Sequence, residues 1–215
     1  MTHGSAKTQT GVSVIELMIA VTLSVVIAAA MIGLFLNSKQ NYRINENMSR
    51  LQESARFAVS FLSRDIRMAD YRECVTADRL PTAVTGTNDT GLNGSDTITL
   101  VWQSNACDAA NTSVTTTYSI LAGATGSPSL FRNVDGVSQE LVEGIENLQI
   151  VYGEDTDGDN VANYFVNAAS VTNMAQAISI RLTLVARTLE ANMTTSGERI
   201  TRNFVSTVTL RNRLP

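Results

Sequence analysis

The sequence predicts an α+β protein in which one long N-terminal helix packs against an antiparallel β-sheet head. An apolar run over residues 12–36 is followed, over residues 37–73, by apolar side chains spaced three and four apart. That spacing is typical of an amphipathic helix. Beyond residue 74, several segments alternate apolar and polar side chains, as strands do when one face of their sheet is wet.

The apolar run is long enough to cross a membrane. Its 25 residues, at ~1.5 Å each, extend over roughly 37 Å, against a bilayer core of ~30 Å. Its single charge is Glu16, and a carboxylate inside a bilayer costs on the order of 2.5–3.5 kcal/mol unless it is paired. A cut after Gly11 would give Val12 a free amino group one helical turn from Glu16. The alternative is that Glu16 reaches the lipid headgroups.

The second half of the helix carries an apolar stripe that we expect to cover one face of the sheet. We predict a continuous helix from about Val12 to Ala69, because no proline occurs before Pro81. The stripe consists of Ile44, Met48, Leu51, Ala55, Ala58, Leu62, Ile66 and Ala69.

The remainder of the chain predicts strands and turns. Residues 75–95 contain one proline and three glycines and predict a loop. The predicted strands are residues 96–103, 113–121, 129–134, 146–153, 177–188 and 203–212.

The composition argues against catalysis and against nucleic-acid binding. The net charge is −4, whereas neutralising phosphates needs clustered positive charge, so no direct nucleic-acid contact is expected. The only histidine is His3, and there are two cysteines. Histidine-based nucleophilic sites and four-cysteine zinc sites are thereby excluded for a chain cut after Gly11. The predicted protein is not an enzyme. An exported, helix-tethered enzyme with a pair of carboxylates remains an alternative, but no such pair is identifiable.

An acidic segment at residues 155–160, DTDGDN, has the spacing of a calcium-binding loop. Its aspartates occupy the first, third and fifth positions of an EF-hand-type loop, but the twelfth position is Val166 in place of an acid. Two interpretations stay open, a calcium site and a solvated acidic turn. The candidate calcium ligands are Asp155, Asp157, Asp159, the backbone carbonyl of Val161, and Asn163.

The N-terminal segment resembles the processing signal of type IV pilins and type II secretion pseudopilins, G-F-T-L-I-E. Gly11 followed by VSVIELMIAV matches it at Gly11, Ile15, Glu16 and Leu17, and departs from it over residues 12–14. The resemblance implies that a prepilin peptidase cuts after Gly11 and methylates the amino group of Val12. Glu16 would then pair with the N-terminal amine of a neighbouring subunit during assembly.

Segments over the rest of the chain resemble the PilW-type minor pilins. They are SKQNYR (38–43), LQESARFA (51–58), SRDIRMADYREC (63–74), GIENLQIVYGEDTDGDN (144–160) and TVTLRNRLP (207–215). The neighbouring alternative is the J-type minor pseudopilin of type II secretion. Within the pilin-like fold, the implied organisation is a leader (1–11), a transmembrane or filament-core helix (12–36), an amphipathic half (37–73) and a β-rich head (74–215).

The resemblance also implies a function, partners and a location. A minor pilin helps to prime pilus assembly, sits near the pilus tip, and supports twitching motility, adhesion and DNA uptake. The expected partners are other minor pilins, the major pilin, prepilin peptidase, the inner-membrane assembly machinery and a large tip adhesin. The expected location is the inner membrane, with the head in the periplasm, and after assembly the pilus surface. In that oxidising compartment, Cys74 and Cys107 are expected to form a disulfide, with two separate thiols as the alternative.

Overall fold

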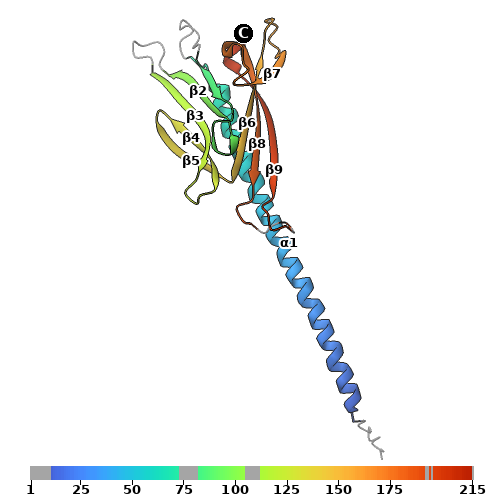
Figure 1. Cartoon of the computed structure of the whole chain (residues 1–215). Helices are drawn as coiled ribbons and strands as arrows, with labels where there is room; N and C mark the ends of the chain where they lie inside the picture. The colour runs from blue at the N-terminus through green and yellow to red at the C-terminus, as the bar shows by residue number, and fades with distance from the viewer. Residues whose placement is uncertain (1–10, 73–81, 105–111, 192–193, 195, 215) are drawn as a thin grey trace, which may run out of the picture. The chain divides into compact units, whose positions relative to one another are not determined.

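The computed structural model describes residues 11–72, 82–104, 112–191, 194 and 196–214 (Figure 1). The chain falls into two compact units, Met1–Glu46 and Asn47–Pro215. The boundary between them lies inside the segment predicted to be the amphipathic half of the helix.

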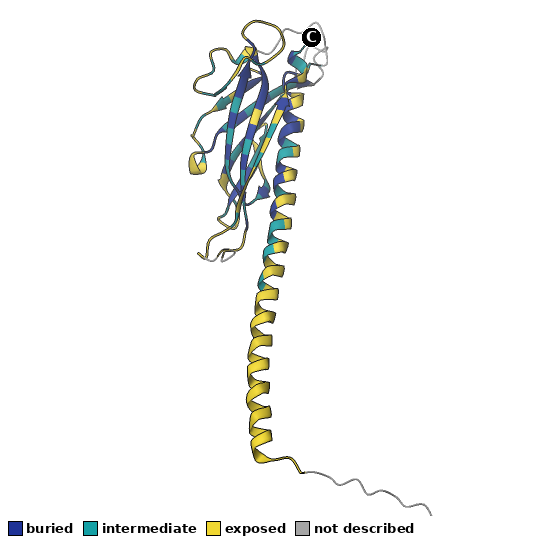
Figure 2. Ribbon diagram, turned by 90° about the vertical axis from the view of Figure 1, so that its right-hand side faces the viewer, coloured by how far each residue is buried: buried dark blue, intermediate teal, exposed yellow. Residues whose placement is uncertain are grey.

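One helix, α1 (Val14–Met68), supplies the first unit and enters the second. Both of its ends lie within two residues of the prediction. Residues 14–36 expose their side chains throughout, as the colouring in Figure 2 shows. By length and composition, the helix is suited to cross a membrane.

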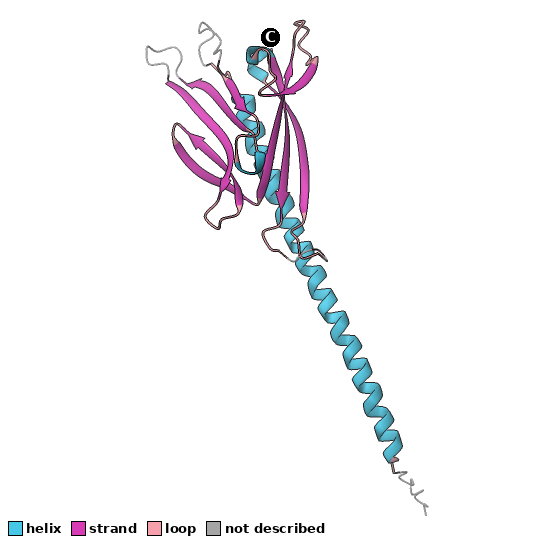
Figure 3. Ribbon diagram, in the orientation of Figure 1, coloured by secondary structure: helices cyan, strands magenta, loops and turns pink. Residues whose placement is uncertain are grey.

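The second unit contains two antiparallel sheets, where the sequence predicted one (Figure 3). One has the order β1-β2-β3-β4-β5 and the other β7-β6-β8-β9. Their bounds are β1 Val84–Thr87, β2 Thr97–Ser104, β3 Thr112–Ala122, β4 Pro128–Val134, β5 Val137–Glu143, β6 Ile145–Glu154, β7 Tyr164–Asn167, β8 Ala177–Arg187 and β9 Thr201–Thr209.

A single residue, Gly144, carries the chain from one sheet to the other. Its N–H donates to Pro128 in β4, and its carbonyl accepts from Arg187 in β8. Its φ is +82°, and a Cβ atom there would lie 2.9 Å from the Arg187 carbonyl oxygen. Glycine suits this position because it has no Cβ and adopts positive φ readily.

A second junction between the sheets is made by Asp96, just before β2. Its backbone N–H donates to the carbonyl of Leu148 in β6, and its carboxylate accepts from the Ile150 N–H at 2.7 Å. Burial raises the pKa of this carboxyl, even though the hydrogen bonds that it accepts act in the opposite direction.

The predicted stripe of α1 is confirmed as the helical face of the core from Leu51 onward, whereas Ile44 and Met48 are half-buried and lie outside the core cluster. From Leu51 onward its members are buried and pack with the inward side chains of both sheets. Two of them, Ala55 and Ala58, are fully buried, and small side chains let a helix approach a sheet closely. The predicted α+β, pilin-like fold is therefore confirmed.

Three of the described strands, β1, β5 and β7, lie outside the predicted ranges, and one prediction ran too far. β1 lies inside the predicted loop at residues 75–95, so that prediction was wrong over Val84–Thr87. β5 was not predicted. The strand predicted to end at residue 212 ends at Thr209, because Arg211–Arg213 form a short 3₁₀ turn.

Candidate functional site

The predicted processing and assembly residues lie together at the start of the described chain. Gly11, Val12 and Ser13 precede α1, and all three are exposed. A Cβ atom added to Gly11 would meet nothing within 4 Å. The fold therefore places no steric demand on Gly11, and any requirement for glycine there must come from another molecule.

Glu16 lies in the first turn of α1, where the positive end of the helix dipole favours a carboxylate. Two hydroxyl groups further along bond to the helix itself: Thr22 donates to the Met18 and Ile19 carbonyls, and Ser24 to that of Val21. Within the part of the chain that the structure describes, Glu16 has no ion-pair partner. Its pairing with an N-terminal amine remains a prediction, and that pairing would supply the missing partner.

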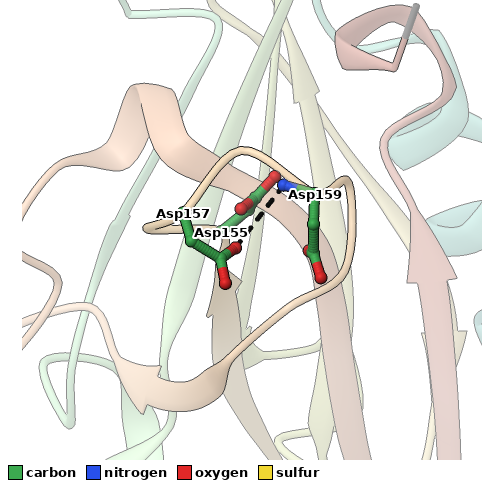
Figure 4. Close-up of side chains that lie close together, drawn as sticks. All are labelled: Asp155, Asp157 and Asp159. Atoms are coloured by element: carbon green, nitrogen blue, oxygen red, sulfur yellow. Dashed lines mark hydrogen bonds between the residues drawn. The ribbon is translucent and has the colours of Figure 1, made fainter.

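The structure brings the three predicted aspartates together in the loop between β6 and β7 (Figure 4). One carboxylate oxygen from each of Asp155, Asp157 and Asp159 lies within 4.8 Å of the others. Gly158 and Asn160 adopt positive φ, and their N–H groups donate to the two oxygens of Asp155 at 2.7 and 2.9 Å.

These hydrogen bonds change the acidity of Asp155. Partial burial raises the pKa of this carboxyl, but the N–H groups of Gly158 and Asn160 outweigh that effect, so the pKa lies below its ordinary value. The loop therefore favours the ionised form of Asp155 through its own backbone.

The Asn163 side chain and the Val161 N–H take part in hydrogen bonds within the loop. The Asn163 side-chain oxygen accepts from the N–H of Thr156 at 2.7 Å, whereas its NH₂ group donates to Asp157 at 3.2 Å. The Val161 N–H donates to Asp159. The loop thus supplies three carboxylates to the cluster, together with internal donors that offset part of their charge. The calcium and solvated-turn interpretations both remain predictions.

The predicted disulfide lies outside the described residues, since residues 73–81 and 105–111 include Cys74 and Cys107.

A buried cluster that the sequence did not predict joins α1 to the five-stranded sheet. The Tyr118 hydroxyl in β3 donates to Oδ2 of Asp65 in α1 at 2.7 Å. Arg132 Nε in β4 donates to the same oxygen at 2.9 Å. Burial, and then the bond to Asp65, raise the pKa of the Tyr118 hydroxyl, so it remains a donor at any physiological pH.

A second unpredicted cluster, the C-terminal clasp of Asp70, Asn212 and Arg213, closes the end of α1. Asn212 Nδ2 donates to the Arg67 and Ala69 carbonyls at 3.0 and 2.9 Å. It thereby satisfies acceptors that a helix C-terminus leaves without partners. Arg213 Nε lies 3.6 Å from Asp70 Oδ2, and each of the two side chains is only 2% exposed.

The C-terminal clasp, and Asp65 of the first cluster, lie in segments that carried the family resemblance. Asp65 and Asp70 fall in residues 63–74, and Asn212 and Arg213 in residues 207–215. A signal was available, because three acids stand among the arginines of the first segment and two arginines lie near the end of the second. Their pairing was not predictable, because the partners are far apart in the sequence.

Comparison with known protein families gives a match in the head. Residues 117–212, which run from within β3 through β9, match the family model of type IV pilus-assembly protein W. The match supports a PilW-type protein of the type IV pilus. No curated protein matches the chain. The PilW-type match includes Tyr118, Arg132 and the acidic loop, so these features lie in the region that resembles the family.

Proposed function

We propose that this PilW-type chain is a minor pilin that helps to prime type IV pilus assembly and sits near the pilus tip. In this role it supports twitching motility, adhesion and DNA uptake. Before assembly it is held in the inner membrane by residues 12–36 with its head in the periplasm, and afterwards it lies at the pilus surface.

The observation that carries this proposal is the uncovered apolar surface of α1 in a chain of a pilus-assembly family. Large hydrophobic side chains between Val14 and Leu36 are 53–75% exposed. Exposing a continuous apolar surface of this kind to water is energetically unfavourable, so lipid or other helices must cover it. In a subunit that moves from a membrane into a helical filament core, lipid covers this surface first and the neighbouring helices cover it afterwards.

Glu16 favours the transfer of the subunit from the membrane to the filament. A carboxylate near the membrane is costly without a partner, and the described chain supplies no ion-pair partner. A processed amino terminus at Val12 of a neighbouring subunit is a partner of the required charge. The proposed partners are therefore other minor pilins and the major pilin. Prepilin peptidase, the inner-membrane assembly machinery and a large tip adhesin complete the proposed set.

The proposed role is structural, without catalysis. A chain cut after Gly11 has no histidine, and the three clustered aspartates lie on a loop, with Asp157 and Asp159 exposed.

The test is a deletion strain complemented with the parent gene and with the Glu16→Ala variant. We expect loss of surface pili and twitching, restoration by the parent gene and not by the variant, and normal secretion of type II substrates. Loss of secretion with intact pili would overturn the proposal and favour the pseudopilin alternative.

A further inference from the structure

The strand β9 forms one border of the four-stranded sheet, as Figure 1 shows at its label. Two hydrogen bonds at its ends define which of its backbone groups face outward. The N–H of Leu210 bonds to Ile178 and that of Thr188 to Ile200, and both bonds continue the β8–β9 ladder in the same register. Even-numbered residues of β9 therefore bond to β8, and the odd-numbered residues point their N–H and C=O groups away from it.

We define the β9 edge as these outward backbone groups of Thr201, Asn203, Val205, Thr207 and Thr209. Among the described residues, no backbone hydrogen bond from another segment reaches them. An edge of this kind is a template for another strand, and proteins commonly blunt such edges with proline, lysine, bulges or short length.

β9 has none of these protections, although the other borders do. It has nine residues without proline, glycine or lysine and pairs with β8 without a shift in register. β1 and β7 have four residues each. β5 has one exposed glutamate, Glu140, and its pairing with β4 contains a register shift. Among the described borders, β9 is therefore the most open to another strand.

The charge beside the β9 edge indicates what kind of strand fits. A cleft between α1 and β9 is lined by Gln52, Arg56, Arg202, Asn203 and Phe204. It has two arginines and no acid in its lining, and within the described chain neither Arg56 nor Arg202 has an ion-pair partner. A strand added beside β9 would place every second side chain over this inner face of the sheet, alongside the cleft.

We propose that the β9 edge docks an extended, acidic strand of another protein by strand addition. The backbone of β9 supplies the pairing, Arg56 and Arg202 select glutamate or aspartate on the inner face, and the exposed Val205 (64% exposed) takes an apolar neighbour on the outer face. Strand addition of this kind derives affinity from main-chain bonds and specificity from alternate side chains.

The test uses the full chain in detergent micelles and a labelled nine-residue peptide of alternating valine and glutamate, followed by fluorescence anisotropy. The valine–lysine peptide and empty micelles are the controls. Val205→Pro removes an outward N–H without breaking the ladder to β8, because edge strands tolerate proline there. Val205→Ala removes the same side chain and keeps the N–H. Circular-dichroism melts verify folding, and Thr207→Pro replaces Val205→Pro if that variant does not fold.

We expect the glutamate peptide to bind at least several-fold more tightly than the lysine peptide, and Val205→Pro to weaken binding about tenfold. Val205→Ala should stay within about twofold, and the double variant Arg56→Gln, Arg202→Gln should remove the preference for glutamate. Equal binding to the proline and alanine variants, or equal binding of the two peptides, would overturn the proposal. Dimers of the chain alone that Val205→Pro abolishes would also overturn the proposal, because a second copy of the chain would then occupy the β9 edge. The measurement needs no pilus, so its failure would leave the proposed pilus role standing.

Discussion

Asp65 on the helix and Arg132 on β4 are 67 residues apart in sequence, yet Arg132 Nε lies 2.9 Å from the Asp65 carboxylate. The Tyr118 hydroxyl donates to the same oxygen. One acceptor thus fixes the helix against two neighbouring strands of the five-stranded sheet.

Removing the acceptor should destabilise the head more than removing either donor. Asp65→Ala leaves a guanidinium and a hydroxyl without their partner, and we expect a loss of about 2–3 kcal/mol in the free energy of unfolding. Tyr118→Phe should cost about 1 kcal/mol. Urea unfolding of the detergent-solubilised chain measures both. Arg64→Ala is the control, because Arg64 lies 3.9 Å from Asp65 but is 75% exposed, and its effect should stay below about 0.5 kcal/mol.

The head should lose stability as the pH rises above about 10. Burial raises the pKa of the Tyr118 and Tyr152 hydroxyls above the ordinary value of 10.0. The unfolded chain then releases these protons at a lower pH than the folded chain, so the free energy of unfolding falls with rising pH. Urea unfolding at neutral pH and near pH 11 measures the drop. Tyr118→Phe and Tyr152→Phe should each reduce it, whereas Tyr164→Phe, at an exposed position, should leave it unchanged.

Processing should depend on Gly11. We expect Gly11→Val to leave the precursor uncut, because the peptidase must accommodate the residue before the cut and the fold leaves space there for a side chain. Immunoblots of membranes measure the ratio of precursor to mature chain. Gly33→Val is the matched control, since a Cβ at Gly33 also meets nothing within 4 Å. Normal mature protein from Gly11→Val would refute the leader assignment.

Assembly should depend on the charge of Glu16. Glu16→Ala and Glu16→Gln should both insert into the membrane normally, because each removes a costly carboxylate. We expect both to reduce co-purification with other pilins and the number of surface pili. Ser24→Ala, whose hydroxyl bonds only to its own helix, should assemble normally. Full piliation with Glu16→Gln would show that the charge is dispensable.

Asp155 should stabilise its loop only when it is ionised. Its pKa is lowered, so its contribution is present above the ordinary value of 3.8 and is lost as the pH falls through the folded-state value. Asp155→Asn should therefore lower the melting temperature at neutral pH, and its effect should shrink as the pH falls below 3.8. Asp159→Asn should have a smaller effect, because Asp159 accepts from Val161 alone within the described loop.

The same melts decide between the two interpretations of the acidic loop. Calcium bound to the folded state would raise the melting temperature in millimolar calcium relative to chelator, and Asp157→Ala would abolish the rise. Equal melting temperatures would assign the loop as a solvated turn.

The sequence contains clear signals for elements whose side chains repeat with a regular period. The stripe from Leu51 to Ile66 and the buried alternation Leu148, Ile150, Tyr152 were predicted because one face of each element is apolar. β5 has no such contrast: Val142 is its one buried residue, and its others are exposed or half-buried. β1 has four residues and includes Gly86, and a strand this short cannot display a recognisable alternation of apolar and polar side chains.

The division into two sheets and the buried charges depend on tertiary contacts that periodicity does not encode. In the sequence, Gly144 looks like any glycine in a turn. Only the structure shows that its N–H bonds to one sheet and its C=O to the other. Asp65 and Tyr118 are 53 residues apart, and neither has a local pattern that specifies the other. The acidic loop was predicted more completely, because its aspartates, Gly158 and Asn160 are neighbours in sequence and local hydrogen bonds fix the turn.

The C-terminal clasp makes the far end of the chain necessary for closing the end of α1. Asn212 bonds to the Arg67 carbonyl across 145 residues, a contact of very high sequence separation, and such contacts slow folding. Until the last residues have folded onto the head, the final turn of α1 lacks its Asn212 cap, and the ion pair between Asp70 and Arg213 is not formed. The helix end then remains open to proteases and to wrong partners. The docking of Asn212 and Arg213 is therefore the step that completes the head.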